Sequence, residues 1–408
     1  MHLVFAALLA LSQGQRAQID AIVERVMRER HVAGLSLGIA RGGTPLYLRG
    51  YGLRDAARRQ PADGYTIYPI GSITKQFTAA LVEQQVAAGG LALDVPLSRY
   101  LPATAPGAGR ATIAQLLGQT SGIVSIDAPL AFDPGTGWRY ANANYVLLGT
   151  VLERVTGVAY PRLLRERILG PLALSSTGYG VPPPARNVAR GYVWRGRRTE
   201  ARVTGADERA SSAAAMVSNA PDLLRWLDAL RTGRVVAPAA FAQMTASGKL
   251  ADGIATNYGF GFFMANWFGY RVAAHPGYVD GFSSQDALVL DDGLEIALLS
   301  NAEAVDLTPL AKSLVAALDP PLDRNLAAEP SRPPQNENPR ITAALEAVAQ
   351  TPAFAGLGKL ASIEFIERTQ ADGVTYDTYR LTFAAGQWRA SIAYRERTLE
   401  SLTLSPIE

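Results

Sequence analysis

The sequence contains no cysteine and only three histidines, His2, His31 and His275, among its 408 residues. Without cysteine the chain has neither a disulfide framework nor thiol chemistry. A metal site built from histidine and cysteine ligands is disfavoured because the ligands are missing. We therefore predict that the protein uses no metal and no cofactor.

Charged residues are also scarce. They make up 18% of the chain, and the formal net charge is only +3. The pI of about 9.0 reflects a slight excess of arginine, without a basic run along the sequence. Because a nucleic-acid-binding protein needs a basic patch or stripe, we predict no nucleic-acid partner.

Long hydrophobic runs are missing as well. No segment reaches the roughly 20 apolar residues that a membrane-spanning helix needs, so we predict no integral membrane span. The apolar stretch from Leu3 to Leu11 is followed by the small residues Ser12 and Gly14. This pattern resembles a short signal peptide over residues 1–14, although it lacks lysine or arginine near its start. We expect a secreted or periplasmic protein; the alternative is a buried N-terminal helix.

The remaining sequence predicts helices between two sets of strands. Apolar residues recur every three or four positions from Gln15 to Arg30, which indicates an amphipathic helix. Apolar strands with turn signals are expected at 32–40, 44–52, 257–277 and 286–300, mostly helices at 71–233, and a closing helix at 308–318. Strands at both ends with helices between them predict an α+β domain over 15–318, with one mixed sheet and a helical insertion.

The C-terminal part has a different composition. Residues 319–340 include six prolines, which is typical of a linker. A short helix at 341–350 and four alternating strands at 363–368, 376–384, 387–396 and 399–404 are expected after it. We predict a small α+β domain over 341–408.

The segment Gly71-Ser72-Ile73-Thr74-Lys75 is the strongest candidate for chemistry. It precedes a predicted helix over 76–88, so Ser72 lies at the helix N-terminus and Lys75 projects from the same face three residues later. Free backbone N–H groups there favour negative charge developing on the Ser72 oxygen. Burial and the same positive end would lower the pKa of Lys75, giving a nucleophile and a base.

Lysine is rare in this chain, which sharpens the prediction. Lys75 is one of only four lysines; the other 35 of the 39 Lys and Arg residues are arginine. Arginine serves wherever charge alone is needed, but it cannot give up its proton, so a base must be lysine. The alternative is a helix-capping serine with a surface lysine.

Two further motifs carry polar groups. In Tyr140-Ala141-Asn142, the phenol is suited to relaying a proton and the amide to binding both Lys75 and a substrate carbonyl. In His275-Pro276-Gly277, glycine would let a substrate backbone approach a strand. The N–H groups of Tyr278 and Ser72 would then form an oxyanion hole. Alternatively, Tyr140 and Asn142 begin a helix, and His275 is a satisfied strand residue.

These motifs occur together in one known superfamily. The chain resembles the serine β-lactamases and penicillin-binding proteins, in the class C-like branch of esterases and D-aminopeptidases, from about Gln15 to Leu318. The matching segments are Gly71–Phe77, Gly90–Asp94, Gln115–Gly122, Tyr140–Asn142, His275–Gly277 and Gly281-Phe282. The resemblance implies a β-lactamase/transpeptidase-like fold.

The resemblance also implies site roles. Ser72 would be acylated, Lys75 and Tyr140 would shuttle the proton, and Asn142 would orient the substrate. The oxyanion would lie between the amides of Ser72 and Tyr278.

Two departures from the family pattern bear on the substrate. The Lys-Thr-Gly segment of the family is His275-Pro276-Gly277 here, and a mostly neutral histidine would not supply the fixed charge that binds a carboxylate. The histidine usual in the family's Leu-Leu-x-His-Thr-Ser-Gly segment is Gln119, which we interpret as structural. Weak or no β-lactamase activity is therefore expected.

Three functions remain open at this stage. The first is a serine hydrolase acting through a Ser72 acyl-enzyme on small esters or on peptides and amides that contain D-amino acids. The second is a D,D-peptidase or weak β-lactamase, and the third is a penicillin-binding-like sensor that binds without turnover. The partner expected in each case is a small molecule or peptide.

A competing nucleophile motif lies near the N-terminus. Gly34-Leu35-Ser36-Leu37-Gly38 matches the G-x-S-x-G elbow of α/β-hydrolases. That elbow requires a strand before its serine and a helix after it, whereas Ser36 lies inside one apolar strand that leads into a hairpin. We interpret Ser36 as a strand residue.

Overall fold

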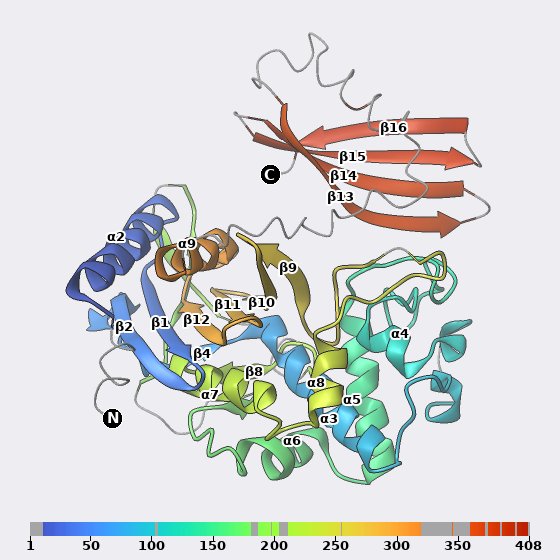
Figure 1. The fold of residues 1–408 in the computed structure, drawn as a ribbon, viewed down its shortest axis with the longest axis horizontal. Helices are drawn as coiled ribbons and strands as arrows, with labels where there is room; N and C mark the ends of the chain where they lie inside the picture. Colours follow the sequence, from blue (N-terminus) through green and yellow to red (C-terminus); the bar gives the residue numbers. More distant parts are fainter. Residues whose placement is uncertain are drawn as a thin grey trace. The chain divides into compact units, whose positions relative to one another are not determined.

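The computed structural model describes residues 11–319 except 103–104, 181–186, 197, 204–210 and 254, then Leu345 and most of 360–406, without 372–373, 384–385 and 396–397. The chain forms two compact units (Figure 1). The first consists of Met1–Leu93, Tyr145–Ser247 and Asn257–Arg324, and the second of Asp94–Asn144, Gly248–Thr256 and Asn325–Glu408.

A seven-stranded antiparallel sheet forms the centre of the first unit. Its order is β3-β2-β1-β12-β11-β10-β9, so the strands from the two ends of the unit pair in the middle as β1 with β12. The bounds are β1 Gly34–Arg41, β2 Thr44–Asp55, β3 Gln60–Pro61, β9 Phe263–Trp267, β10 Tyr270–Val279, β11 Phe282–Val289 and β12 Leu294–Ser300.

Helices cover both faces of this sheet. On one face α2 (Gln13–Glu29) and α9 (Thr308–Leu318) lie together, and Ile19 and Leu314 join a core with Leu37 and Ile296 of the sheet (Figure 1). On the other face α7 (Ala220–Arg231) packs against β1 and β12. Strands β11 and β12 are buried throughout, and burying each leucine or valine contributes about 1.5–3 kcal/mol.

The segment that holds the predicted nucleophile lies next to α7. A 3₁₀ turn, η1 (Gly71–Ile73), leads into α3 (Thr74–Ala87), and Phe77 of α3 stacks on Trp226 of α7 with ring centroids 3.8 Å apart. Gly89, with a positive φ of 74°, follows the end of α3 as predicted. The other helices with residues in this unit are α5 (Asn142–Thr156), α6 (Tyr160–Leu164), the π-turn η4 (Arg165–Leu169) and α8 (Pro238–Met244).

The second unit contains short helical segments and a separate sheet. The segments are η2 (Leu97–Arg99), η3 (Ala108–Arg110), α4 (Ile113–Leu117) and the first residues of α5. The sheet is an antiparallel meander of β13 (Leu360–Ala371), β14 (Val374–Phe383), β15 (Gly386–Arg395) and β16 (Thr398–Pro406). Alternate residues Tyr379, Leu381 and Phe383 are buried in its core, together with Leu345.

Most predicted elements are present, and the α+β fold is confirmed. The closing helix 308–318 and the four C-terminal strands lie where they were expected, and α2 begins two residues earlier. Of the predicted helix at 341–350 only Leu345 is described, and the predicted linker lies almost entirely outside the described residues.

The middle of the chain contains short strands that the sequence did not predict. They are β4 (Tyr68–Pro69), β5 (Gly178–Tyr179), β6 (Gly191–Trp194), β7 (Thr199–Arg202) and β8 (Met216–Ser218). Each of these strands is too short to show the alternating pattern that marks a strand in sequence. Strand β8 also pairs with β4 and β5, which are remote from it in the sequence.

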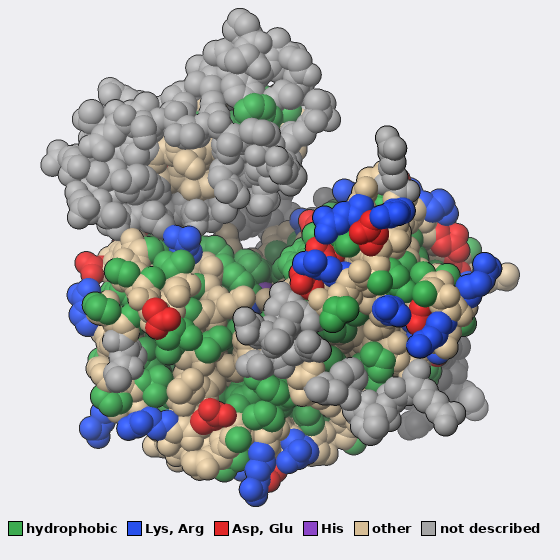
Figure 2. Space-filling model, turned by 180° about the vertical axis from the view of Figure 1, so that it is seen from behind, with side chains coloured by type: hydrophobic (Ala, Val, Ile, Leu, Met, Phe, Trp, Pro, Cys, Tyr) green, Lys and Arg blue, Asp and Glu red, His purple; other side chains and the backbone are tan. Residues whose placement is uncertain are grey.

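Two properties of the surface bear on possible partners. In the described part of the chain, no helix is long and apolar enough to cross a bilayer. On the face shown in Figure 2, Lys and Arg side chains are interspersed with Asp and Glu.

Candidate active site

The turn η1 presents Ser72 beside strand β10. Gly71 has φ +51°, and a Cβ added to it would lie 2.7 Å from the backbone N of Tyr278. Only glycine combines this backbone conformation with so close an approach. The Oγ1 of Thr74 donates to the Gly71 carbonyl at 2.6 Å and fixes the turn. Ser72 is partly exposed, in the first turn, where backbone N–H groups have no intrahelical acceptor.

Lys75 lies one turn further along α3 and contacts Ser72. Its Nζ is 3.0 Å from Ser72 Oγ and donates to the Ala213 carbonyl at 3.0 Å. The Lys75 side chain is fully buried, and burial lowers its pKa well below the ordinary value, in the predicted direction. A neutral amine at this position has a lone pair that can accept the Ser72 proton.

An aromatic side chain that the sequence reasoning missed borders Lys75. The Nζ lies 5.6 Å from the ring centroid of Tyr145, which is fully buried in α5. Tyr145 follows Asn142 by three residues, but a tyrosine within an apolar helix gives no signal of its own.

The end of β10 is held tightly against η1 by the protein itself. A Cβ on Gly277 would lie 2.1 Å from the Ile70 carbonyl and 2.3 Å from Ser284 Oγ. Ser284 of β11 donates to the same carbonyl at 2.8 Å. The space beside the Gly277 Cα is therefore filled by Ile70, whose carbonyl is what requires glycine here. A substrate approach at Gly277 stays a prediction.

His275 is a buried, neutral side chain. Its Nδ1 lies 2.6 Å from the Pro276 carbonyl, which can only accept, so Nδ1 carries the proton. Nε2 is left as an acceptor for the hydroxyl of Tyr258 at 3.2 Å. Burial, with a smaller effect from the Lys75 charge, lowers the pKa of His275 to about 3. The ring therefore supplies no positive charge at neutral pH, as the sequence predicted.

Tyr140 and Asn142 lie in the second unit. Tyr140 is partly exposed just before α5, and Asn142 is the exposed first residue of that helix. Gln119 holds the segment: its Oε1 accepts from Ala141 N at 3.1 Å and from Asn144 Nδ2 at 2.6 Å. Gln119 is fully buried, which agrees with its interpretation as structural.

Ser36 has the surroundings of a strand residue. It lies inside β1, fully buried, and its hydroxyl donates to the Asp63 carbonyl at 2.6 Å. Tyr68 Oη lies 3.0 Å away. No helix follows Ser36, since β1 continues to Arg41 and turns into β2, so the residue does not occupy a nucleophile elbow.

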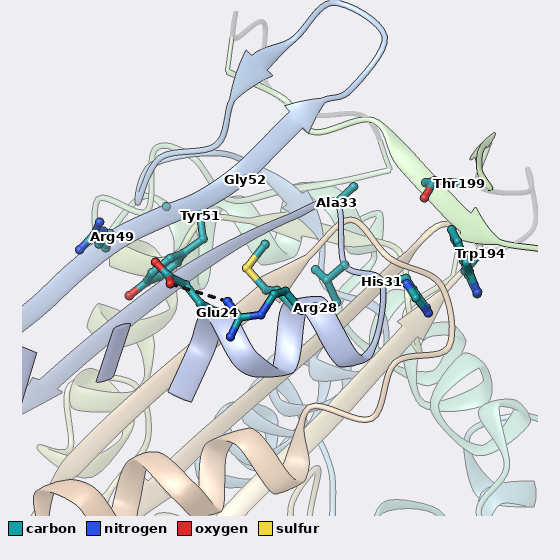
Figure 3. A pocket seen from close by; sticks show the side chains of 12 residues that line it. Glu24, Arg28, His31, Ala33, Arg49, Tyr51, Gly52, Trp194 and Thr199 are labelled. Atoms are coloured by element: carbon teal, nitrogen blue, oxygen red, sulfur yellow. Dashed lines mark ion pairs between the residues drawn. The ribbon is translucent and has the colours of Figure 1, made fainter. Parts of the chain in front are cut away.

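Two cavities in the first unit are lined by residues other than the predicted site residues. One of about 610 Å³ lies between α2, β2 and the β6–β7 hairpin, and none of the predicted site residues lines it (Figure 3). A smaller one, about 240 Å³, is mostly apolar. Its lining includes Ala214 and Val279, which are next in sequence to Ala213 and Tyr278, and also Arg190 and Arg202.

The fold and the buried Ser–Lys contact define a class, and comparison with known proteins names the family. Beside an antiparallel sheet, a serine at the start of a helix lies 3.0 Å from a buried lysine amine, which is an arrangement suited to nucleophilic catalysis. The Beta-lactamase family model matches residues 19–318. The chain belongs to the beta-lactamase family.

Individual relatives agree with this membership. Esterase EstB from Burkholderia gladioli is 29% identical over 311 residues, covering 61% of this chain and 79% of the esterase. The D-stereospecific amidohydrolase structure from Streptomyces sp. has a TM-score of 0.61 and 26% identity, covering 73% of this chain and 98% of that one.

A third structure extends the likeness in fold. The octameric penicillin-binding protein homologue from Pyrococcus abyssi has a TM-score of 0.67 at 22% identity and covers 95% of this chain and 99% of its own. The likeness thus continues beyond the residues that the family model matches. Taken with the esterase and the amidohydrolase, the family makes this protein a serine hydrolase of the beta-lactamase fold.

Proposed function

We propose that the protein hydrolyses small esters, or peptides and amides containing D-amino acids, through an acyl-enzyme on Ser72. The observation that carries the proposal is the 3.0 Å contact between Ser72 Oγ and the buried Nζ of Lys75. A buried lysine amine lowers the stability of the fold. Its role as the acceptor of the Ser72 proton explains why it is present here.

The proposed reaction has two halves. Ser72 Oγ attacks the substrate carbonyl carbon while Lys75 takes the hydroxyl proton, and the carbonyl oxygen becomes an oxyanion facing the N–H groups of Ser72 and Tyr278. The C–O or C–N bond then breaks, and the leaving alcohol or amine takes the proton. In the second half, water attacks the acyl carbon, and the acid leaves as Ser72 recovers its proton.

Tyr140 and Asn142 are proposed as partners in these steps. The family motif supports a phenol that passes the proton to the leaving group and an amide that orients the substrate. Replacing Tyr140 by Phe tests the relay, because the hydroxyl is removed and the ring is kept.

Two features favour a small, uncharged acyl group. The cavity of about 240 Å³ has a mostly apolar wall that includes Ala214, Val217 and Val279, with Arg190 and Arg202 also in its lining. An esterase and a D-stereospecific amidohydrolase among the relatives support ester and amide substrates.

The charges near Tyr278 disfavour substrates that carry a carboxylate. A third cavity, of about 390 Å³, is lined by Tyr278 together with Asp280, Glu303 and Asp306, and the described residues that line it include neither lysine nor arginine. The guanidinium of Arg202 already pairs with Asp280 at 2.9 Å and Glu303 at 3.2 Å. His275 is neutral as well, so it provides no positive charge to bind the carboxylate of a β-lactam or of a peptide C-terminus. We expect β-lactam turnover to be weak or undetectable.

Hydrolysis of p-nitrophenyl acetate and butyrate by wild type and Ser72→Ala tests the proposal. We expect the variant to lose at least about a thousandfold in kcat/KM. Ser36→Ala, the same substitution at the competing motif, should retain hydrolysis. Equal activity of wild type and Ser72→Ala would refute the proposal, whereas a stable Ser72 adduct without turnover would favour the sensor.

A further inference from the structure

A carboxyl group buried in β11 joins the nucleophile helix to strand β10. Asp286 is completely buried, and its Oδ2 accepts from Nε2 of Gln76 at 2.7 Å. Its Oδ1 accepts from the backbone N of His275 at 2.9 Å. Gln76 follows Lys75 in α3, and His275 lies three residues before Tyr278 in β10.

The amide of Gln76 is committed at both ends. While Nε2 donates to Asp286, Oε1 accepts from Nε1 of Trp226 at 2.9 Å, and Trp226 lies in α7. Gln76 is also fully buried. The orientation of this amide is therefore fixed by a donor on one side and an acceptor on the other, and Asp286 must present an acceptor to it.

Burying this carboxyl group is costly. Burial raises the pKa of Asp286 to about 7, against three hydrogen bonds that favour the ionised form, from Gln76, from the backbone N of His275 and from its own backbone. An apolar side chain at position 286 alone would leave Nε2 of Gln76 and the backbone N of His275 without this acceptor, but replacing a whole buried polar set by apolar groups is often neutral or stabilising. A function other than stability explains why a carboxyl group stands here.

We propose that Asp286 is a positioning residue for the Ser72 reaction, an inference that rests on the proposed function. It links α3, which carries the nucleophile and its base, to β10, which carries the amide of Tyr278. The link sets how far the N–H of Ser72 lies from the N–H of Tyr278, the two donors proposed for the oxyanion. Asp286 itself need not touch the substrate.

Kinetics separates positioning from mere support of the fold. A displaced oxyanion donor weakens the transition state more than the bound substrate, so kcat falls while KM changes little. A fold that is simply less stable gives a lower fraction of active protein with unchanged kcat per labelled site. Active sites are therefore counted by titration with a fluorophosphonate.

The first variant is Asp286→Asn, which keeps the shape of the side chain. An amide offers one acceptor and one donor to two partners that both donate, so one hydrogen bond becomes a repulsive contact. We expect kcat on p-nitrophenyl butyrate to fall on the order of tenfold to a hundredfold, as a small misplacement can cause. Glu295→Gln is the matched control, because it also removes a buried carboxyl group, but in β12 next to Gly43 and Arg231.

The double variant Asp286→Asn with Gln76→Glu tests the hydrogen-bond pattern. The new amide in β11 would donate to the new carboxylate in α3, which still accepts from Trp226, while the amide oxygen accepts from His275 N. We expect most of the lost kcat to return. Unchanged kcat in Asp286→Asn, or no recovery in the double variant, would overturn the positioning role alone. Wild type no faster than Ser72→Ala would refute the proposed function and this inference together.

Discussion

At the scale of single residues, the buried amine of Lys75 distinguishes Ser72 from an ordinary serine at the start of a helix. Ser72 contributes a hydroxyl, and Lys75, whose pKa is lowered by burial, is the proposed base. The two are brought within 3.0 Å because they lie three residues apart at the start of α3.

Lys75→Arg removes the base while keeping a positive side chain. Arginine stays protonated, so we expect kcat/KM for p-nitrophenyl butyrate to fall by about a thousandfold or more. Lys312→Arg makes the same change in α9, where Nζ lies over the ring of Trp267, and should leave the rate unchanged. A Lys75→Arg enzyme as active as wild type would show that Lys75 is not the base.

The pH dependence of the rate should report Lys75 and exclude His275. Lysine must be neutral to act, so kcat/KM is expected to fall as pH falls through its lowered pKa. His275, with a pKa of about 3, stays neutral and adds no step between about pH 5 and 8. A rate profile measured over this range for wild type and Asp286→Asn checks both statements, because Asp286 has a pKa of about 7 and is absent from the variant. A step near 6.5 that disappears in His275→Asn would contradict the second.

At the scale of elements, the tight packing of η1 on β10 should be as important as the side chains. In Gly277→Ala the added Cβ would lie 2.1 Å from the Ile70 carbonyl, so backbone must move. We expect a loss of about 1–3 kcal/mol in unfolding free energy, with a fall in kcat, measured by urea unfolding and ester hydrolysis.

A second glycine provides the control for this substitution. Gly90→Ala would place a Cβ 3.2 Å from the flexible end of Gln85, with no positive φ to strain it. It should be close to wild type in both measurements. If Gly277→Ala matched it, the proposed contact between η1 and β10 would not limit activity.

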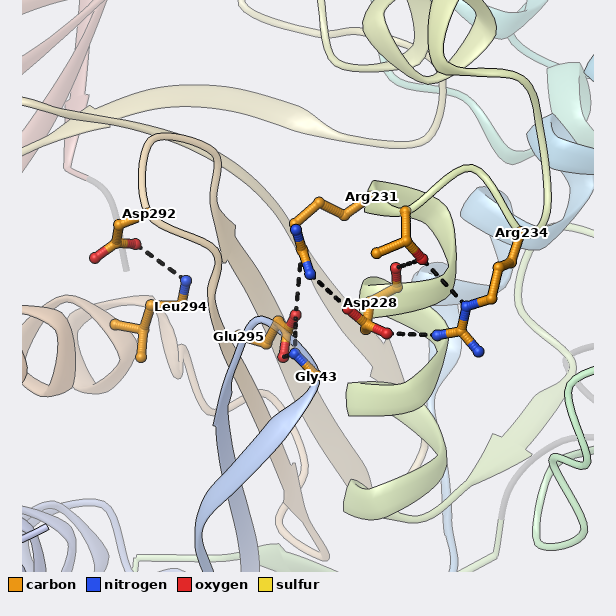
Figure 4. A network of polar contacts seen from close by, with 8 residues as sticks. Gly43, Asp228, Arg231, Arg234, Asp292, Leu294 and Glu295 are labelled. Carbon is orange, nitrogen blue, oxygen red and sulfur yellow. Dashed lines mark hydrogen bonds and ion pairs between the residues drawn. The ribbon is translucent and has the colours of Figure 1, made fainter. Parts of the chain in front are cut away.

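Glu295 in β12 should make stability depend on pH. It is fully buried between Gly43 and Arg231, and burial raises its pKa to about 7 (Figure 4). The folded state then holds more protons than the unfolded one between about pH 4.5 and 7, so stability falls as pH rises across that window.

Glu295→Gln should lack this loss. The unfolding free energy of wild type relative to the variant is expected to decline by on the order of 1–3 kcal/mol between about pH 5 and 7.5. Chemical denaturation at a series of pH values measures the difference. Parallel curves for the two proteins would mean that Glu295 titrates alike in both states.

Elements with their own periodicity could be predicted from sequence, and those fixed by distant partners could not. The apolar pattern located α9, and the Asp-Asp-Gly turn located the β11–β12 hairpin. Strand β8 and the Asp286–Gln76 bond depend on partners far along the chain, so nothing local marks them. The Ser72–Lys75 contact was predictable because helix geometry alone determines it.

At the scale of the whole molecule, the family fold was predictable because its motifs occur in one order, including segments without chemistry. The reason why position 277 needs glycine was not predictable. It is the carbonyl of Ile70, which lies in a segment that meets β10 only in the folded chain. The same holds for Tyr145, whose ring borders Lys75 only through packing of α5.

Export is the remaining proposal at this scale. The predicted cleavage after Gly14 lies in the first turn of α2, whose N-cap Ser12 forms a capping box with Gln15. Losing this cap would cost about 1 kcal/mol. We expect an exported chain beginning at Gln15, measured by mass spectrometry of the periplasmic or secreted fraction. An uncleaved chain found only in the cytoplasm would contradict it.

The most direct test of the central claim is to trap the acyl-enzyme. Wild-type protein is mixed with p-nitrophenyl butyrate, quenched in acid within one turnover and digested, and the modified peptide is mapped by mass spectrometry. We predict one butyryl group on Ser72, absent from Ser72→Ala and depleted in Lys75→Arg. Turnover of the ester with the butyryl group on another residue, or with none on any residue, would contradict the account.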